Sequence, residues 1–250
     1  MYNERSKHHG ADKLKSTEEA HLSLTGSANS FMQSNIAYAD EDGAQRTIIM
    51  GRQEMLAQLK KKGTQIHVDA TFAVPVGFYQ CLIIGVFGDH EAFLPCVYIL
   101  MTRKNRLAYE VALSTLQTLL GGKIKPAYAL TDFETAMYQS IQKFFPEAEV
   151  MGCFFHFVQA LTRKMIKIGF SQEFAFREVK RFYLLCICER DEVFDKAVPF
   201  LEMQIMMDDR GTWTTEEDNN WRKFFDYLKN QWDDEEKIRL FNYSGRLKEM

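Results

Sequence analysis

The sequence predicts an α/β fold in which a mixed β-sheet is flanked by helices and an all-helical C-terminal segment follows. Three observations lead to this prediction. Alternating and apolar runs of strand length occupy residues 66–101, strand and helix patterns then alternate up to about residue 170, and only helical patterns come after that point. With 250 residues, 46% of them hydrophobic, the chain can form one domain with a sizeable core and a smaller addition.

The first half of the core reads as an antiparallel meander of three strands. Residues 66–72 alternate between apolar and polar side chains, whereas residues 79–87 and 94–101 are almost wholly apolar. The polar turn Gly88–Glu91 joins the last two strands as a hairpin. A topology of this kind can place the next strand beside the first.

Helices and short strands alternate in the second half of the core. Asn105 is a good N-cap for the next helix, and Gly121 and Gly122 end it. The remaining pattern predicts a strand over 126–130, a helix over 133–144, a strand over 149–153 and a helix ending at Gly169. Three further helices follow, over Glu173–Cys188, Asp191–Met207 with a break at Pro199, and Asp218–Trp232.

These patterns divide the chain into three parts. Residues 1–64 read as a polar N-terminal lead-in with a short helix, residues 65–170 as the core, and residues 171–250 as a helical insertion or extension. The charge is also uneven, since residues 66–180 carry 11 basic and 10 acidic side chains and residues 181–250 carry 11 and 16. The net charge of −3 excludes a histone-like basic coat, but a local basic patch on the core is compatible with it.

Cysteine usage and hydropathy indicate an intracellular protein without a membrane span. The five cysteines are an odd number, three of them lie in apolar runs, and no signal peptide precedes them, which argues against a secreted disulfide framework. The longest apolar stretch, Tyr79–Phe87, is too short to cross a bilayer.

Two aspartates are candidates for chemistry, and each has a simpler alternative. Asp69 lies within an apolar strand segment, where a carboxylate is costly to bury unless it is paired or bound to a metal; alternatively it points to the solvent side of the strand. Asp132 follows a strand, where α/β sheets bind ligands, but it could equally be the N-cap of the next helix. Two carboxylates on neighbouring strands could hold Mg²⁺ or Mn²⁺.

Two further features accompany the aspartates. Cys153 and His156 have metal-ligand spacing, but zinc needs about four ligands and only Cys186 and Cys188 offer a weak complement, so a hydrogen-bonded structural pair is the simpler interpretation. A group of three basic residues shares one helical stretch and could contact phosphates or simply be solvated, namely Arg163, Lys164 and Lys167.

As an ordered set, the motifs from about His67 to Gly169 resemble the Mutator-like element (MULE) transposase domain of the ribonuclease-H-like, DDE-type superfamily. The matching stretches are Val68-Asp69-Ala70-Thr71-Phe72, Thr131-Asp132-Phe133-Glu134-Thr135-Ala136, Phe145-Pro146, Gly152-Cys153-Phe154-Phe155-His156-Phe157 and Gln159-Ala160-Leu161-Thr162-Arg163-Lys164.

The resemblance implies a cut-and-paste DNA transposase that works in the nucleus. Such enzymes cut DNA at terminal inverted repeats and join the ends to a target, with Mg²⁺ or Mn²⁺ held by two aspartates and a glutamate. Asp69 matches the first aspartate and Asp132 the second, and Cys153 with His156 matches the family's Cys-x-x-His signature. The implied partners are DNA and, as a homo-oligomer, further copies of the chain.

The chain departs from the family pattern in ways that leave enzymatic activity open. Ala70 stands where glycine is usual, and no stretch matches the Arg-Thr-Asn-Asn segment that precedes the family's catalytic glutamate, so the third acid is unknown. We therefore expect a truncated or degenerate transposase core with little or no strand transfer by this chain alone. The alternative is a non-catalytic, transposase-derived module that binds DNA or protein.

Overall fold

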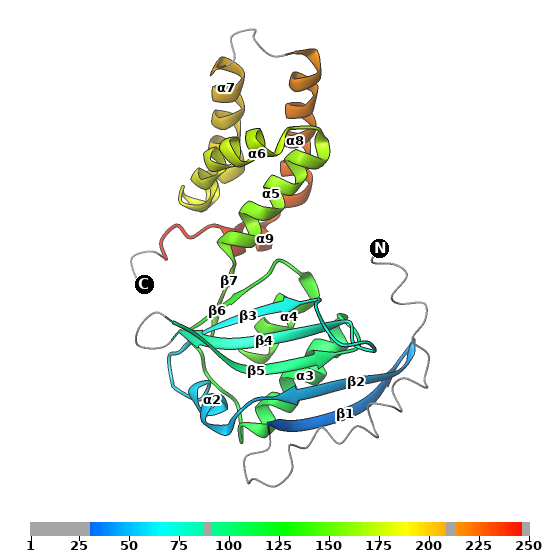
Figure 1. The fold of residues 1–250 in the computed structure, drawn as a ribbon. Coiled ribbons are helices and arrows are strands. Elements are labelled where there is room, and N and C mark those ends of the chain that lie inside the picture. The colour runs from blue at the N-terminus through cyan, green and yellow to red at the C-terminus, as the bar shows by residue number, and fades with distance from the viewer. Residues whose placement is uncertain (1–30, 88–91, 209–213, 247–250) are drawn as a thin grey trace. The chain divides into compact units, whose positions relative to one another are not determined.

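The computed structural model describes residues 31–87, 92–208 and 214–246. The chain divides into two compact units, Met1–Val150 and Met151–Met250, which we call the sheet unit and the helical unit. Figure 1 shows a sheet with flanking helices in the first and only helices in the second. The predicted α/β class with C-terminal helices is therefore confirmed.

In the part of the chain that the structure describes, seven strands form one mixed sheet in the order β1-β2-β5-β4-β3-β6-β7. Strands β3, β4 and β5 pair as the predicted antiparallel meander, and β6 lies parallel to β3 on its other side, as the topology suggested. The predicted turn at Gly88–Glu91 lies outside the described residues. The strand bounds are β1 Met32–Asp40, β2 Gly43–Met50, β3 Gln65–Thr71, β4 Gln80–Phe87, β5 Phe93–Met101, β6 Tyr128–Thr131 and β7 Glu149–Gly152.

The predicted lead-in over residues 1–64 needs correction. Helix α2, Gln53–Gln58, is the expected short helix, but β1 and β2 form an antiparallel hairpin that extends the sheet through β5. The part before residue 31 lies outside the described residues. The strands escape sequence patterns because they bury polar side chains, some of which find partners within the sheet, as where buried Arg46 donates to Asn35 Oδ1 at 3.0 Å.

Helices α3 (Arg106–Leu119) and α4 (Thr135–Phe144) pack against each other, and α3 contacts β2 while α4 contacts β6 (Figure 1). Asn105 is the N-cap of α3, as predicted, because its Oδ1 accepts from the Ala108 amide at 2.9 Å. The core of this unit is mostly aliphatic and includes Ile48, Ile66, Ile84, Ile99 and Leu116.

The helical unit begins earlier than the predicted boundary at residue 171. Helix α5, Phe154–Ile168, belongs to it, because Phe157 stacks on Phe241 at 4.6 Å and meets Trp232 edge-on at 4.9 Å between ring centroids. Sequence patterns could not reveal these partners, which lie at the far end of the unit.

Several short helices and the longer α7 (Val198–Asp208) and α8 (Thr215–Trp232) make up the rest of the helical unit within the described residues. Pro199 lies in the first turn of α7, directly after a π-helical turn, where the sequence predicted a break. None of the helices in the described ranges is both long and apolar enough to cross a membrane. The remaining bounds are α6 Gln172–Glu178, 3-10 helices Val179–Cys186 and Arg190–Glu192, the π-helix Val193–Ala197, α7 Val198–Asp208, α8 Thr215–Trp232 and α9 Glu235–Phe241.

Candidate functional site

The parallel pairing of β3 with β6 brings the two predicted aspartates to the same level of the sheet. Val68 is the register partner of Thr131, and both are buried. Asp69 and Asp132 are the next residues along each chain, so they follow a matched pair at the same edge of two adjacent strands. Asp69 is exposed and Asp132 is half-buried, which leaves both carboxylates within reach of solvent.

The structure also decides between the alternatives for each aspartate. The N-cap of α4 is Glu134, not Asp132, so the capping interpretation of Asp132 is wrong. Its Oδ1 instead accepts from the Phe133 amide at 2.6 Å, and Oδ1 of Asp69 accepts from the Ala70 amide at 2.8 Å. The expectation that Asp69 faces solvent is confirmed, and it is compatible with ligand binding.

A third carboxylate, which sequence reasoning did not select, lies beside Asp132. The buried Tyr109 hydroxyl of α3 donates to Glu134 Oε2 at 2.9 Å, and Gln80 Nε2 of β4 donates to the Tyr109 hydroxyl at 2.9 Å. Burial raises the pKa of Glu134, and the charge of Asp132 adds to this shift. The one sequence signal for this arrangement was Gln80, a polar residue at the start of an otherwise apolar strand. In the structure Gln80 is fully buried.

A cation and two aromatic rings adjoin these acids. The ammonium of the exposed Lys104 lies 6.0 Å from the ring centroid of Phe72 and 5.7 Å from that of Tyr79, and the two rings meet edge-on at 5.8 Å. The positive charge of Lys104 lowers the pKa of Glu134, against the larger effect of burial, which places the ammonium within electrostatic range of that carboxylate.

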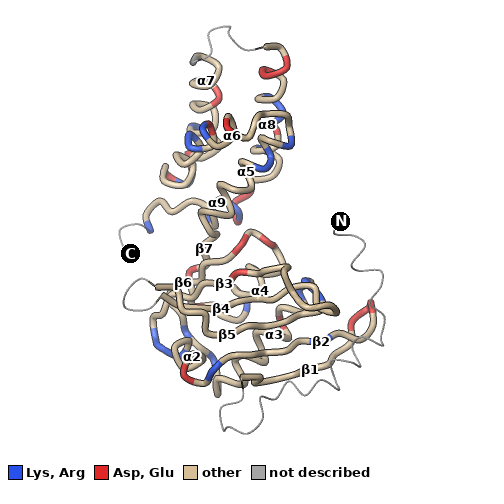
Figure 2. Tube along the Cα trace, in the orientation of Figure 1, with Lys and Arg blue, Asp and Glu red and all other residues tan. Residues whose placement is uncertain are grey.

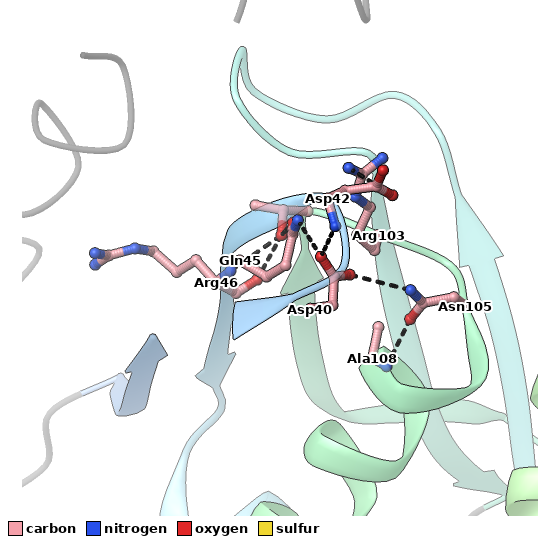
Figure 3. Close-up of polar contacts among 8 residues, drawn as sticks. Asp40, Asp42, Gln45, Arg46, Arg103, Asn105 and Ala108 are labelled. Carbon is pink, nitrogen blue, oxygen red and sulfur yellow. Dashed lines mark hydrogen bonds and ion pairs between the residues drawn. The ribbon is translucent and has the colours of Figure 1, made fainter. Parts of the chain in front are cut away.

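A polar network fixes the segment that carries Lys104 (Figure 3). The Asp40 carboxylate accepts from Gln45 Nε2 at 2.9 Å and from Asn105 Nδ2 at 3.1 Å, and Thr102 donates to Gln45 Oε1 at 2.8 Å. Arg103 pairs with Asp42 at 2.9 Å in the same corner. Contacts from the β1–β2 hairpin thus hold Arg103 and Asn105, the residues on either side of Lys104. The fold therefore sets the backbone position of Lys104.

The donors at Asp69 and Asp132 suit a hard divalent cation. Within the described parts of the chain, no three His, Cys, Asp or Glu side chains gather closely enough to hold a metal by themselves. Mg²⁺ commonly binds through one or two carboxylates, with waters and substrate phosphates as its other ligands. Two solvent-accessible carboxylates on adjacent strands therefore fit Mg²⁺ or Mn²⁺ in the presence of a phosphate substrate.

Cys153 and His156 belong to the helical unit and form a hydrogen-bonded pair. Cys153 is the N-cap residue of α5, and no third metal-ligand side chain gathers with the pair among the described residues, Cys186 and Cys188 included. Burial alone would raise the pKa of the Cys153 thiol, but the hydrogen bonds and charge of His156 outweigh it, and the pKa is lowered overall. The hydrogen bond is compatible with the structural-pair interpretation, which stays a prediction.

The three predicted phosphate-contact residues lie on α5, where basic positions are visible in Figure 2. Arg163 and Lys167 are exposed and lie one helical turn apart, whereas the Lys164 ammonium sits 4.7 Å from the ring centroid of Tyr227. Lys164 therefore has a packing role, which its position in the sequence did not reveal.

The comparisons with known proteins agree with the resemblance in the sequence. No curated protein matches the chain. Residues 65–160 match the family model of the MULE transposase domain. The matched segment contains strands β3–β7, helices α3 and α4, both aspartates, and the Cys153–His156 pair. Residues 65–160 are therefore similar to the MULE transposase domain, as the motifs in the sequence predicted.

Proposed function

We propose that this chain binds divalent metal and DNA at Asp69 and Asp132 and acts on phosphodiester bonds as part of DNA transposition. The observation that carries the proposal is the β3–β6 register, which aligns the two aspartates at one edge of the sheet. The match of residues 65–160 to the MULE transposase domain supports DNA as the ligand.

The residues have distinct roles in this proposal. Asp69 and Asp132 hold Mg²⁺ or Mn²⁺, and Glu134, fixed by Tyr109, adds negative charge that favours a cation at this edge. A bound divalent metal supplies charge stabilisation to the scissile phosphate and activates water or a 3′-hydroxyl for in-line attack. DNA ends and target DNA are then the partners, self-association would bring two ends together, and the nucleus is the expected location.

A second candidate function rests on a specific observation. No third carboxylate gathers with Asp69 and Asp132 into a complete metal-ligand cluster among the described residues, and the third acid of the family has no sequence match. The domain could therefore serve as a non-catalytic DNA-binding or protein-interaction module. We expect weak strand transfer at most from this chain alone.

Metal titration separates the two candidates. Mn²⁺ binding is measured by electron paramagnetic resonance, and nicking of supercoiled plasmid is followed in parallel, for the unaltered chain, Asp69→Asn, Asp132→Asn and the exposed control Glu54→Gln. We expect each aspartate change to weaken Mn²⁺ binding about tenfold or more, because even indirect changes at metal sites cost about 10–100-fold.

Each result has a defined meaning. Loss of Mn²⁺ binding in both aspartate variants, with Glu54→Gln unaffected, supports the metal site. Nicking that disappears with it supports phosphodiester chemistry, whereas metal binding without nicking favours the non-catalytic module. Equal Mn²⁺ binding by all four proteins would overturn the metal assignment.

A further inference from the structure

We infer that Phe72, Tyr79 and Lys104 form a binding site for an unpaired nucleotide of the DNA, next to the two aspartates. This inference deepens the proposed function and rests on it for the identity of DNA as the ligand. It concerns a part of the site that metal binding alone does not require.

The first argument is the exposure of the Phe72 ring. Phe72 is 38% exposed and directly follows β3, three residues beyond Asp69, so its ring lies at the same end of the strand as the candidate metal site. Tyr79 holds the ring by an edge-on contact at 5.8 Å. The exposed part of this ring offers aromatic surface on which a base can stack, and stacking tolerates any base sequence.

The second argument is the placement of Lys104. Its ammonium lies about equally far from both rings, at 6.0 and 5.7 Å, while its charge also acts on Glu134. A cation between an aromatic surface and a group of acids can pair with the phosphate of a nucleotide whose base stacks on the ring. Glu134 accepts its hydrogen bond from the Tyr109 hydroxyl, and Lys104 is exposed, so its ammonium can reach a phosphate.

The third argument is rigidity. The residues on both sides of Lys104 are tied to the β1–β2 hairpin, by the Asp42–Arg103 ion pair and by the Asp40–Asn105 hydrogen bond (Figure 3). Asn105 also caps α3. These contacts restrain the backbone on both sides of Lys104, so less backbone freedom is lost on binding than in a free loop.

An unpaired nucleotide fits this cluster better than paired duplex does. A stacking platform needs the face of a base, and in a duplex that face is covered by the neighbouring base pairs. The site would therefore prefer a frayed or overhanging end, as arises when a strand is cut beside the metal site. Lys104 would contribute to any DNA, whereas Phe72 would contribute only where a base is free.

The test compares two DNA probes in a buffer with EDTA, so that no metal-dependent step contributes. One fluorescent hairpin duplex has a blunt end, and the other carries a short single-stranded 3′ overhang. Binding is measured by anisotropy at several salt concentrations.

Two variants of Phe72 are compared. Phe72→Leu removes the π-face but keeps an apolar side chain, whereas Phe72→Trp keeps an aromatic ring. The control is Phe87→Leu, an exposed phenylalanine at the opposite end of the sheet, because β4 runs antiparallel to β3.

We expect the unaltered chain to prefer the overhang, and Phe72→Leu to lose about five- to tenfold in affinity for it with little effect on the blunt probe. Phe72→Trp and Phe87→Leu should bind like the unaltered chain. Lys104→Ala should weaken binding to both probes. The slope of the logarithm of the binding constant against the logarithm of the salt concentration should also fall by about 1, as expected for the loss of one phosphate contact. An overhang of abasic residues, which keeps the phosphates, should bind no better than the blunt end.

Three results would overturn the inference: equal binding of the two probes, equal loss in Phe72→Leu and Phe87→Leu, or unchanged binding to the abasic overhang. A failure of the proposed metal chemistry remains distinguishable, since absent Mn²⁺ binding with an intact overhang preference would refute the metal site alone. Absent DNA binding both in EDTA and with Mn²⁺ present would refute both.

Discussion

The sheet unit and the helical unit use the same kinds of residue for different purposes. In the sheet unit the core is mostly aliphatic, while Phe72 and Tyr79 lie beside Lys104 near the end of β3. In the helical unit the aromatic residues form the core itself, centred on Trp221, which is 0% exposed and lies within 6.4 Å between ring centroids of Phe170, Phe182, Phe224 and Phe225.

This difference indicates which of the two units can form a ligand-binding site. Parallel and antiparallel strand pairing brings residues from distant segments to one edge of a sheet, and ligands bind at such edges. The helical unit instead uses its aromatic rings for packing. Its buried Asn242 also has a structural role, because Nδ2 donates to the Leu185 and Cys188 carbonyls. The comparison supports the proposal that the chemistry lies in the sheet unit.

Removing the central ring of the helical unit should have the largest effect. Trp221→Ala leaves a large cavity among its five phenylalanine neighbours, Phe174 included, and we expect it to lower the free energy of unfolding of that unit by about 3–5 kcal/mol. The control is Phe176→Ala, since Phe176 is 54% exposed in the same unit, with an expected change within about 0.5 kcal/mol. Hydrogen exchange by mass spectrometry should show faster exchange in residues 151–246 and unchanged exchange in residues 31–150. Equal acceleration in both would mean that the units do not unfold separately.

A smaller loss is expected from the buried network of the sheet unit. Tyr109→Phe removes the hydroxyl that donates to Glu134 while keeping the ring, and a half-buried carboxylate without its donor costs about 1–3 kcal/mol. Denaturant unfolding of a double-mutant cycle with Glu134→Ala measures the coupling, because the cost of Tyr109→Phe should fall by about 1 kcal/mol or more once the carboxylate is gone. Additive effects would show that Tyr109 does not support Glu134.

Much of the fold could be predicted from the sequence because its strands bury one or both faces. The alternation over residues 66–72 and the apolar runs that follow gave β3, β4 and β5, and Asn105 and Gly169 marked helix ends correctly. The β1–β2 hairpin was missed because Arg46 and Gln45 are buried polar residues with partners on other elements. No local pattern distinguishes such residues from those of a polar loop.

The candidate site was predictable only in part for a related reason. Asp69 and Asp132 interrupt or follow strands, so they can be selected from their neighbours along the chain. Glu134, Tyr109 and Lys104 sit in ordinary helical and loop contexts, and their proximity depends on the packing of α3 against the sheet. The boundary between the units was misplaced because the partners of α5 lie on the last two helices.

The smallest expected effect tests whether the helical unit holds any reactive group. Cys153 and Cys188 are both half-buried there, but the pKa of Cys153 is lowered by His156, whereas burial and the charges of Glu189 and Glu192 raise the pKa of Cys188. The thiolate is the nucleophile, so Cys153 should begin to react with iodoacetamide at a lower pH than Cys188 does. Peptide mapping of alkylation over a series of pH values measures both residues in one sample, and His156→Gln should move the Cys153 profile towards that of Cys188. Coincident profiles in the unaltered chain would show that the Cys153–His156 pair only packs, and the helical unit would then be scaffold throughout its described residues.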